Sequence, residues 1–307
     1  MPARELDGRF EIGFAAIPRE RIGHADQVAL ISQQAAIDIR VYGGIDVRLH
    51  PERGLDLGAA WYRGVPLAWI AAAGEAGTRS TDWRAAWGGG LVTTCGLDNV
   101  GSPSEGIPLH GTYVFLRAED VRSARTDDEV VCDAVVRDPR GLRVERTIRT
   151  RLGEGRVELN DHTLNISEES LEAPLLYHVN LGWPLWDLGA RVATNAREVV
   201  ARDADAQAHD WRDAPTTAEE PERVWEHVGA TRASVTNDRL GLKLTIESDL
   251  PRLWQWVDPN PGIYVLGLEP ANCSVLGRAY DRAQGRLPRL APGEARSSTL
   301  ILTAELA

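Results

Sequence analysis

The sequence is dominated by stretches in which apolar and polar residues alternate one by one. In the segments 37–41 and 45–49 every second residue is apolar, and Gly43 and Gly44 lie between the two segments. Successive side chains of a β-strand point to opposite faces, so this alternation gathers the apolar side chains on one face of an extended chain. The pattern predicts two strands joined by a tight turn.

Similar patterns recur as far as the C-terminus, with Gly, Pro, Asn and Asp between them. They predict a second hairpin, made of 142–152 and 156–159, and further strands at 175–181, 240–248, 253–257, 263–268 and 298–306. A helical pattern is expected only around 219–228. Closely spaced strands without long helices between them predict an all-β protein and disfavour Rossmann and TIM-barrel folds.

No linker-like segment divides the 307 residues. We therefore predict one domain spanning residues 1–307, in which roughly the first 30 residues form an appended strand or arm. The polar, Ala- and Asp-rich segment 197–222 is predicted to be a long excursion on the surface of this domain.

The charged residues exclude several classes of function. A formal net charge of −11 argues against nucleic acid and anionic membranes as partners, because both bind basic surfaces. Lys243 is the only lysine, and its alternation with Leu242 and Leu244 places it on the polar face of a predicted strand. Schiff-base chemistry requires a desolvated lysine, so aldolases of that type and pyridoxal enzymes are disfavoured.

The cysteines indicate the compartment. Cys95, Cys132 and Cys273 are odd in number and form no CxxC pair. The N-terminal residues show no apolar signal-peptide core, and no segment approaches the roughly 20 apolar residues of a membrane-spanning helix. These features predict a cytoplasmic protein without a disulfide framework.

A carboxylate stands at the end of one apolar strand. Val265, Gly267 and Glu269 share a face, and Pro270 restricts Glu269 to an extended conformation. Gly267 has no side chain and leaves space beside the carboxylate. A carboxylate beside a void in an apolar strand is typical of a general base with a raised pKa. A Glu that is paired with arginine or exposed to solvent explains the pattern equally well.

Two histidines lie in similarly apolar surroundings. His178 shares a strand face with Leu176 and Asn180, and His110 lies between Leu109 and Gly111. Each fits a catalytic residue or a hydrogen-bonded core histidine. Asn180 favours the first interpretation for His178, because it adds a second polar group to the same face.

Other site chemistries fit the sequence less well. No HxH, HExxH or CxxC spacing suggests a metal site, and no GxSxG elbow suggests a serine hydrolase. A glycosidase needs a second carboxylate beside Glu269, and Asp98 or Asp258 could supply it.

Taken in order, these segments resemble the aldose 1-epimerase (galactose mutarotase) superfamily. Leu109-His110-Gly111 is similar to its Leu-His-Gly motif, and Tyr177-His178-Val-Asn180-Leu181 to its second histidine with Asn-Leu. Leu268-Glu269 with Asn272 resembles the strand that carries the general base, and Leu290-Ala-Pro-Gly-Glu294 resembles its C-terminal signature. The stretches 89–101, 176–180 and 269–272 resemble a divergent, uncharacterised bacterial branch of the superfamily.

The resemblance implies a large antiparallel β-supersandwich and acid–base mutarotation without metal or cofactor. It implies that Glu269 takes the proton of the anomeric hydroxyl and that His178 protonates the ring oxygen. Substrate binding is expected from His110, Arg84, Asn180, Asp98, Trp254 and Asn272, with Arg79, Asp258 and Trp256 as further candidates. The usual Asn-Arg motif before the first histidine is absent from this chain.

The expected partner is a free monosaccharide, and a homodimer is one assembly compatible with the sequence. Two other functions remain open on the same scaffold. One is a hydrolase or lyase that acts on glycosides, and the other is a non-catalytic carbohydrate-binding protein.

Overall fold

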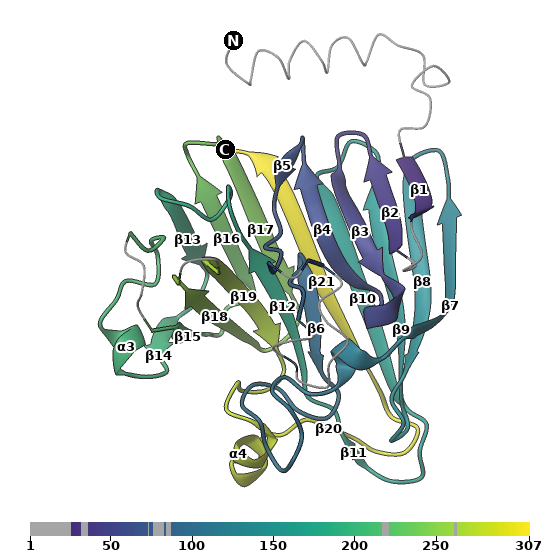
Figure 1. Cartoon of the computed structure of the whole chain (residues 1–307). Coiled ribbons are helices and arrows are strands. Elements are labelled where there is room, and N and C mark those ends of the chain that lie inside the picture. Colours follow the sequence, from purple (N-terminus) through teal and green to yellow (C-terminus); the bar gives the residue numbers. More distant parts are fainter. Residues whose placement is uncertain are drawn as a thin grey trace.

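The computed structural model describes residues 26–31, 36–72, 74–75, 83, 87–216, 221–260 and 263–307, and of these 26–31 by backbone alone. Two large antiparallel sheets stand face to face in this part of the chain (Figure 1). Short loops and two small helices lie at their ends. The prediction of an all-β sandwich is therefore confirmed.

The first sheet has eleven strands and carries the candidate site. Its order is β1-β2-β3-β4-β6-β12-β19-β18-β15-β14, and β5 pairs with β4. The strands are β1 (Asp26–Ile31), β2 (Ala36–Val41), β3 (Ile45–His50), β4 (Asp56–Tyr62), β5 (Val65–Pro66), β6 (Val92–Gly96), β12 (Leu175–Leu181), β14 (Glu198–Ala201), β15 (Arg223–Val228), β18 (Arg252–Asp258) and β19 (Val265–Ala271).

The second sheet has eight strands in the order β13-β16-β17-β21-β10-β9-β8-β7. They are β7 (Ala118–Arg125), β8 (Glu129–Arg137), β9 (Leu142–Arg151), β10 (Arg156–Asn165), β13 (Ala190–Thr194), β16 (Arg232–Asn237), β17 (Leu242–Ser248) and β21 (Ala295–Leu306). The remaining elements are β11 (Leu171–Glu172) paired with β20 (Arg289–Leu290), the helices α3 (Ala204–Gln207) and α4 (Arg278–Ala283), and the 3-10 turns η2 (Pro51–Arg53) and η3 (Tyr113–Phe115).

The strands follow the alternation of the sequence closely. The hairpins β2–β3 and β9–β10 form as predicted, and the strand expected at 175–181 has the predicted bounds. The strands expected at 240–248, 253–257, 263–268 and 298–306 are present with shifted ends. Lys243 lies on the polar face of β17, with Nζ 3.0 Å from a carboxylate oxygen of Glu305. Residues 1–25 of the expected N-terminal arm lie outside the described residues, and β1 pairs with β2 at the edge of the first sheet.

The helical turn predicted around 219–228 is wrong. Residues 223–228 form strand β15 between β14 and β18, and residues 217–220 are not among those described. Val224 and Trp225 are both buried because the two faces of this strand are covered. Burial on both faces removes the alternation that identifies a strand from its sequence.

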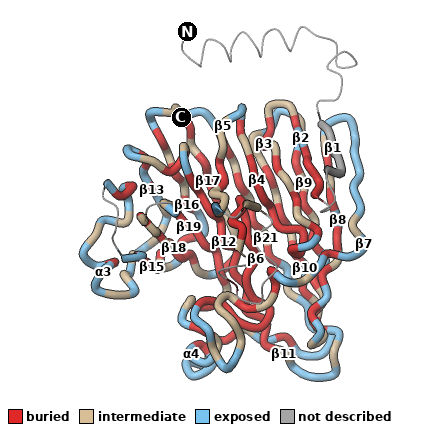
Figure 2. The backbone as a smooth tube through the Cα atoms, viewed as in Figure 1, coloured by how far each residue is buried: buried red, intermediate tan, exposed pale blue. Residues whose placement is uncertain are grey.

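The main core lies between the sheets and is made of buried residues from both, and Figure 2 shows the buried residues along the strands of the two sheets. A second, smaller apolar cluster covers the other face of the first sheet and includes Cys95, Leu176, Trp254 and Ala271. All seven residues of β12 and all seven of β19 are consequently buried. Polar groups on these two central strands are therefore held in a low-dielectric surrounding.

One charged side chain crosses the core. Arg146 of β9 is fully buried, and its guanidinium donates to both carboxylate oxygens of Asp161, at 2.7 and 2.8 Å. It also donates to Asp56 of β4 at 3.0 Å, so it links the two sheets. Tyr177 Oη donates to Asp161 at 2.8 Å. Every member has charged or hydrogen-bonding partners, which is what makes buried charge tolerable.

Candidate active site

The register of two central strands sets His178 against Glu269. In the β12–β19 ladder Asn180 pairs with Gly267 and Val179 pairs with Leu268, so His178 faces Glu269 across the strands. Side chains directly opposite each other in an antiparallel pair lie on the same face. His178 Nε2 is 3.2 Å from Glu269 Oε1, and each residue is 3 % exposed.

His110 reaches the same place from a loop. Its backbone has a φ of 57°, and the following Gly111 has a φ of 75°. The His110 amide donates to the carbonyl of Gly101 at 2.9 Å, which closes the loop. The imidazole centroids of His110 and His178 are 5.5 Å apart. His110, His178 and Glu269 therefore lie close together, although they are distant along the chain.

These three side chains line one cavity of about 470 Å³. Tryptophans form much of its wall: the rings of Trp69 and Trp87 are 4.8 Å apart, and those of Trp83 and Trp87 are 5.2 Å apart. Trp256 lies edge-on to His178, with centroids 5.5 Å apart. The polar lining on the far side comes from Arg202, Glu222 and Asp258. A concave, mostly apolar cavity with a few converging polar groups is typical of a ligand site.

Burial shifts the two ionisable groups in opposite directions. Desolvation is the main cause that raises the pKa of Glu269, the charge of Glu222 adds to it and Arg202 partly offsets both, with a net pKa of about 8. Desolvation lowers the pKa of His178 well below its usual value, and the nearby His110 acts in the same direction. The free protein at neutral pH therefore holds a largely neutral carboxylic acid beside a neutral imidazole.

Several polar atoms at the cavity have no hydrogen-bond partner in the described structure. Glu269 Oε1 contacts His178 without an aligned hydrogen bond, and His178 Nδ1 and Trp83 Nε1 are also unpaired. Unpartnered buried polar atoms are costly, and native proteins retain few of them. Their clustering at the cavity suits a ligand that brings hydroxyl groups.

The structure keeps Asn180, Asn272 and Trp254 out of the cavity lining. Asn180 Nδ2 donates to the carbonyl of Gly90 at 2.9 Å. Asn272 Oδ1 accepts from the Leu175 amide at 2.7 Å, which joins the end of β19 to the start of β12. Trp254 Nε1 donates to a backbone carbonyl at 3.2 Å and packs in the smaller apolar cluster. The expectation that they bind substrate is not supported by these positions, which fit supporting roles.

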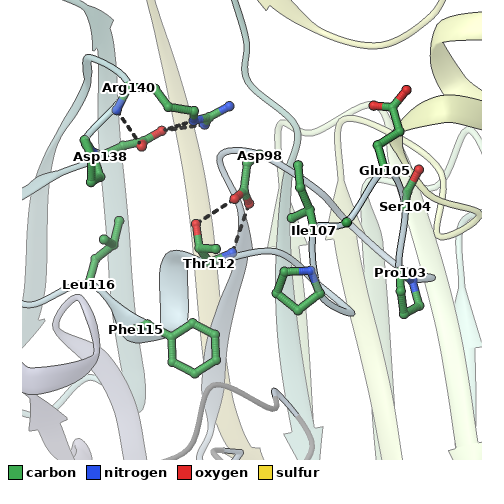
Figure 3. Close-up of a pocket in the computed structure, with 13 residues that line it drawn as sticks. Asp98, Pro103, Ser104, Glu105, Ile107, Thr112, Phe115, Leu116, Asp138 and Arg140 are labelled. Carbon is green, nitrogen blue, oxygen red and sulfur yellow. Dashed lines mark hydrogen bonds and ion pairs between the residues drawn. The ribbon is translucent and has the colours of Figure 1, made fainter.

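Asp98, which was also expected to bind substrate, does not line this cavity either. Its carboxylate accepts from the Thr112 amide at 2.9 Å and from the Thr112 hydroxyl at 2.7 Å (Figure 3). It lines a neighbouring cavity of about 880 Å³ with Ile107 and Phe115. Asp98 thus anchors the turn that follows His110, and Asp258 is the aspartate that lines the tryptophan-walled cavity.

The predicted arginines Arg84 and Arg79 lie outside the described residues. Sequence reasoning did not select Arg202, Glu222, Trp69 or Trp87 for the site. The two charged residues belong to the segment 197–222, which was predicted to be a surface excursion. The one sequence feature that could have indicated the tryptophans is that three of them lie between residues 69 and 87.

Two further features bear on the class of protein. Within the described ranges, no group of three or more His, Cys, Asp or Glu side chains is arranged to hold a metal ion. No helix in the described part of the chain has the length and apolar character needed to cross a membrane.

Solved structures share this fold at low sequence identity. A provisionally named aldose 1-epimerase from Klebsiella pneumoniae is 21 % identical, with a TM-score of 0.79 over 91 % of this chain and 83 % of the other. A galactose mutarotase-like protein from Clostridium acetobutylicum is 13 % identical, with a TM-score of 0.65 over 92 % and 98 %. A provisionally named aldose 1-epimerase from Escherichia coli K12 is 16 % identical, with a TM-score of 0.63 over 86 % and 97 %.

The chain has no significant match among curated proteins. A family model described as a domain of unknown function, DUF4432, matches residues 33–304. The mutarotase-like fold and this match agree with the divergent branch expected from the sequence. The chain belongs to the DUF4432 family, and its own fold is that of the galactose mutarotase-like proteins.

Proposed function

We propose that the protein is a cofactor-free mutarotase that interconverts the α and β anomers of a free aldose. The observation that carries this proposal is the His178–Glu269 pair, with Nε2 and Oε1 3.2 Å apart at the wall of a cavity of about 470 Å³. Mutarotation needs one group that removes a proton and one that supplies a proton, placed on two oxygens of the same ring. A carboxylate and an imidazole side by side meet that need.

The proposed reaction begins with ionised Glu269 and a neutral His178 that carries its proton on Nε2. Glu269 removes the proton of the anomeric hydroxyl and becomes a neutral acid, while His178 donates its Nε2 proton to the ring oxygen and becomes an imidazolate, and the C1–O5 bond breaks. The open-chain aldehyde rotates about C1–C2. Ring closure on the other carbonyl face returns both protons, so the protein ends in its starting state.

The surroundings of the pair support this chemistry. The raised pKa of Glu269 makes its ionised form a stronger base than an exposed carboxylate, at the cost of a smaller ionised fraction. The lowered pKa of His178 keeps its imidazole neutral, so a single ionisation governs the pair. His110 lies close enough to contact the ring oxygen or a hydroxyl of the sugar. All three cysteines are free thiols, which fits a cytoplasmic location.

The test is the rate of anomer exchange, followed by NMR across a panel of aldoses. The variants Glu269→Gln and His178→Asn are expected to lower kcat/KM by about 10²-fold or more, because a positioned proton transfer contributes about 10²–10⁴. The matched controls are Glu305→Gln and His162→Asn, which change exposed residues of the second sheet. Wild-type rates in both site variants would refute the mechanism.

A glycoside-acting hydrolase is the second candidate, because Asp258 and Glu222 place further carboxylates in the cavity. Glycosidases use two carboxyl groups, one on each side of the bond that breaks. Incubation with aryl glycosides separates the two functions. A hydrolase releases the aryl alcohol in a Glu269-dependent reaction, whereas a mutarotase only accelerates anomer exchange of the free sugar.

A further inference from the structure

The end of the cavity remote from His110 is built by a row of residues across the first sheet. Val224 pairs with Trp256, and Trp256 pairs with Gly267. Arg202 extends this row by one strand, because its amide donates to the Val224 carbonyl at 2.8 Å. Val224, Trp256, Arg202 and Glu269 all line the same cavity, so it extends from Glu269 to Arg202.

Glu222 ties the two large members of this row together. Its Oε1 accepts from Arg202 Nη1 at 3.3 Å, and its Oε2 accepts from Trp256 Nε1 at 3.0 Å. Arg202 Nε donates in addition to Asp203 at 2.7 Å. The guanidinium is therefore fixed from two sides, and the indole that lies edge-on to His178 is fixed by the same carboxylate.

Arg202, Glu222 and Asp258 line the cavity and can form further hydrogen bonds with a ligand. Arg202 Nη2 takes part in neither of the ion pairs with Glu222 and Asp203, and the arginine side chain is 29 % exposed. Glu222 is 44 % exposed, and Asp258 lines the same wall. An arginine fork beside carboxylates offers adjacent donors and acceptors, which suits the neighbouring hydroxyl groups of a sugar.

The charged residues that line the cavity disfavour binding of an anionic ligand. Among the described residues that line the cavity, Arg202 is the single arginine, whereas Glu222, Asp258 and Glu269 are acidic. Arg202 is also already paired with two carboxylates. A phosphate or carboxylate group on the ligand would meet net negative charge, and like charges brought together weaken binding.

We propose that Arg202 and Glu222, with Asp258 beside them, bind the non-reacting hydroxyls of an uncharged aldose whose anomeric end lies at His178 and Glu269. The inference rests on the proposed function for the orientation of the sugar. The site would accept neutral aldoses and reject sugar phosphates and uronic acids.

Two readouts test the proposal. Tryptophan fluorescence reports binding without catalysis, because four tryptophans line the cavity. Anomer exchange reports catalysis. Both are measured for D-glucose, D-galactose, L-fucose and D-xylose and for glucose 6-phosphate and galacturonate. At least one neutral sugar is expected to bind, with glucose 6-phosphate and galacturonate about tenfold weaker or worse.

The variants Arg202→Gln and Glu222→Gln should raise the KM and the fluorescence Kd for the neutral sugar about tenfold, because each loses a charge-assisted hydrogen bond. The matched controls are Arg191→Gln and Asp213→Asn, which change a solvent-exposed ion pair elsewhere on the molecule. They should leave both values unchanged.

The pH dependence of kcat/KM tests whether Arg202 and Glu222 act on the site or only support the fold. Glu269 is faced by His178, His110, Glu222, Asp258 and Arg202. The charge of Glu222 raises the pKa of Glu269 and that of Arg202 lowers it. Glu222→Gln should therefore move the midpoint of the kcat/KM profile to lower pH, and Arg202→Gln should move it to higher pH.

The outcomes distinguish this proposal from the proposed function. Tighter binding of glucose 6-phosphate than of every neutral sugar, or control-like KM and Kd values in both variants, would overturn the proposal while leaving mutarotation intact. Binding of neutral sugars that the two variants weaken, without any exchange by the wild type, would support it and refute mutarotation.

Discussion

Gly267 lies directly against the carboxylate of Glu269. A Cβ added at Gly267 would be 2.5 Å from Glu269 Oε1 and 3.1 Å from His178 Cε1. No other residue type fits at this position without moving one of the two groups. The Glu269 carboxylate itself therefore occupies the space at Gly267 that the sequence suggested would be a void beside it.

Gly267→Ala should reduce anomer exchange strongly without unfolding the protein. Gly267 lies in a regular strand, so its backbone tolerates alanine, but the methyl group would displace the Glu269 carboxylate. We expect a loss of at least about tenfold in kcat/KM, because small misplacements of reacting groups are costly. Gly44→Ala is the control, since its Cβ would come no nearer than 3.1 Å to any neighbour. An unchanged rate in Gly267→Ala would show that the present position of the Glu269 carboxylate is not needed for exchange.

Enzyme-catalysed exchange should rise with pH up to about 8. Glu269 acts as a base only when ionised, and its pKa is raised to about 8. The pKa of His178 lies well below 6.5, so imidazole titration adds no opposing limb above that pH. The measurement is kcat/KM from pH 6 to 9 after subtraction of uncatalysed exchange, which reports the ionisation of the free enzyme. A flat or falling profile between pH 6 and 8 would contradict the assignment of Glu269.

Burial of Glu269 should make the protein less stable as pH rises. The pKa of Glu269 is raised from 4.5 to about 8 in the folded state, so between these values the folded protein binds more protons than the unfolded chain. The free energy of unfolding then falls with pH, by at most about 1.4 kcal/mol per unit from this group. Urea unfolding of wild type and Glu269→Gln should show a difference that grows from pH 5 to pH 8 in favour of the variant. Parallel pH dependences would mean that Glu269 titrates normally.

Arg146→Met should destabilise the sandwich severely. The substitution leaves Asp161 and Asp56 buried without their cationic partner, and breaking a buried ion pair from one side costs about 3–5 kcal/mol. Urea unfolding measures the loss. Arg232→Met is the control, because its partner Glu247 is exposed and such surface pairs contribute about 0–1 kcal/mol. Equal stabilities of the two variants would show that Asp161 and Asp56 are protonated or rearranged.

Much of the fold could be predicted from alternation alone, since most strands have one polar face. β9 and β10 are examples: their buried positions alternate with half-exposed or exposed ones along the whole strand. β15 could not be identified this way. Its Trp225 packs into the main core while Val224 packs into the smaller cluster on the other face, so no periodic signal remains.

In the candidate site, too, the sequence identifies some residues and misses others. His178 and Glu269 stand out because polar groups in buried strands need a reason, and the strand register then brings them together. Trp254 and Trp256 have equal parity, and the sequence analysis preferred Trp254, whereas the structure places Trp256 at the cavity. Trp256 borders the cavity because it lies opposite Gly267, whereas Trp254 lies opposite Glu269 and is covered. The strand register and the size of the side chain opposite each tryptophan decide which of the two borders the cavity. Neither can be read from the local pattern of apolar and polar residues.

The position of β12 and β19 in the middle of the first sheet has an evolutionary consequence. Their neighbours on both sides fix the spacing of His178 and Glu269, whereas Arg202 and Glu222 lie near the sheet margin, beside the α3 segment. Insertions or substitutions at the margin can reshape the far wall while the central ladder keeps its alignment. If the proposed function holds, a lineage built on this scaffold can therefore change which sugar it accepts while His178 and Glu269 keep their alignment.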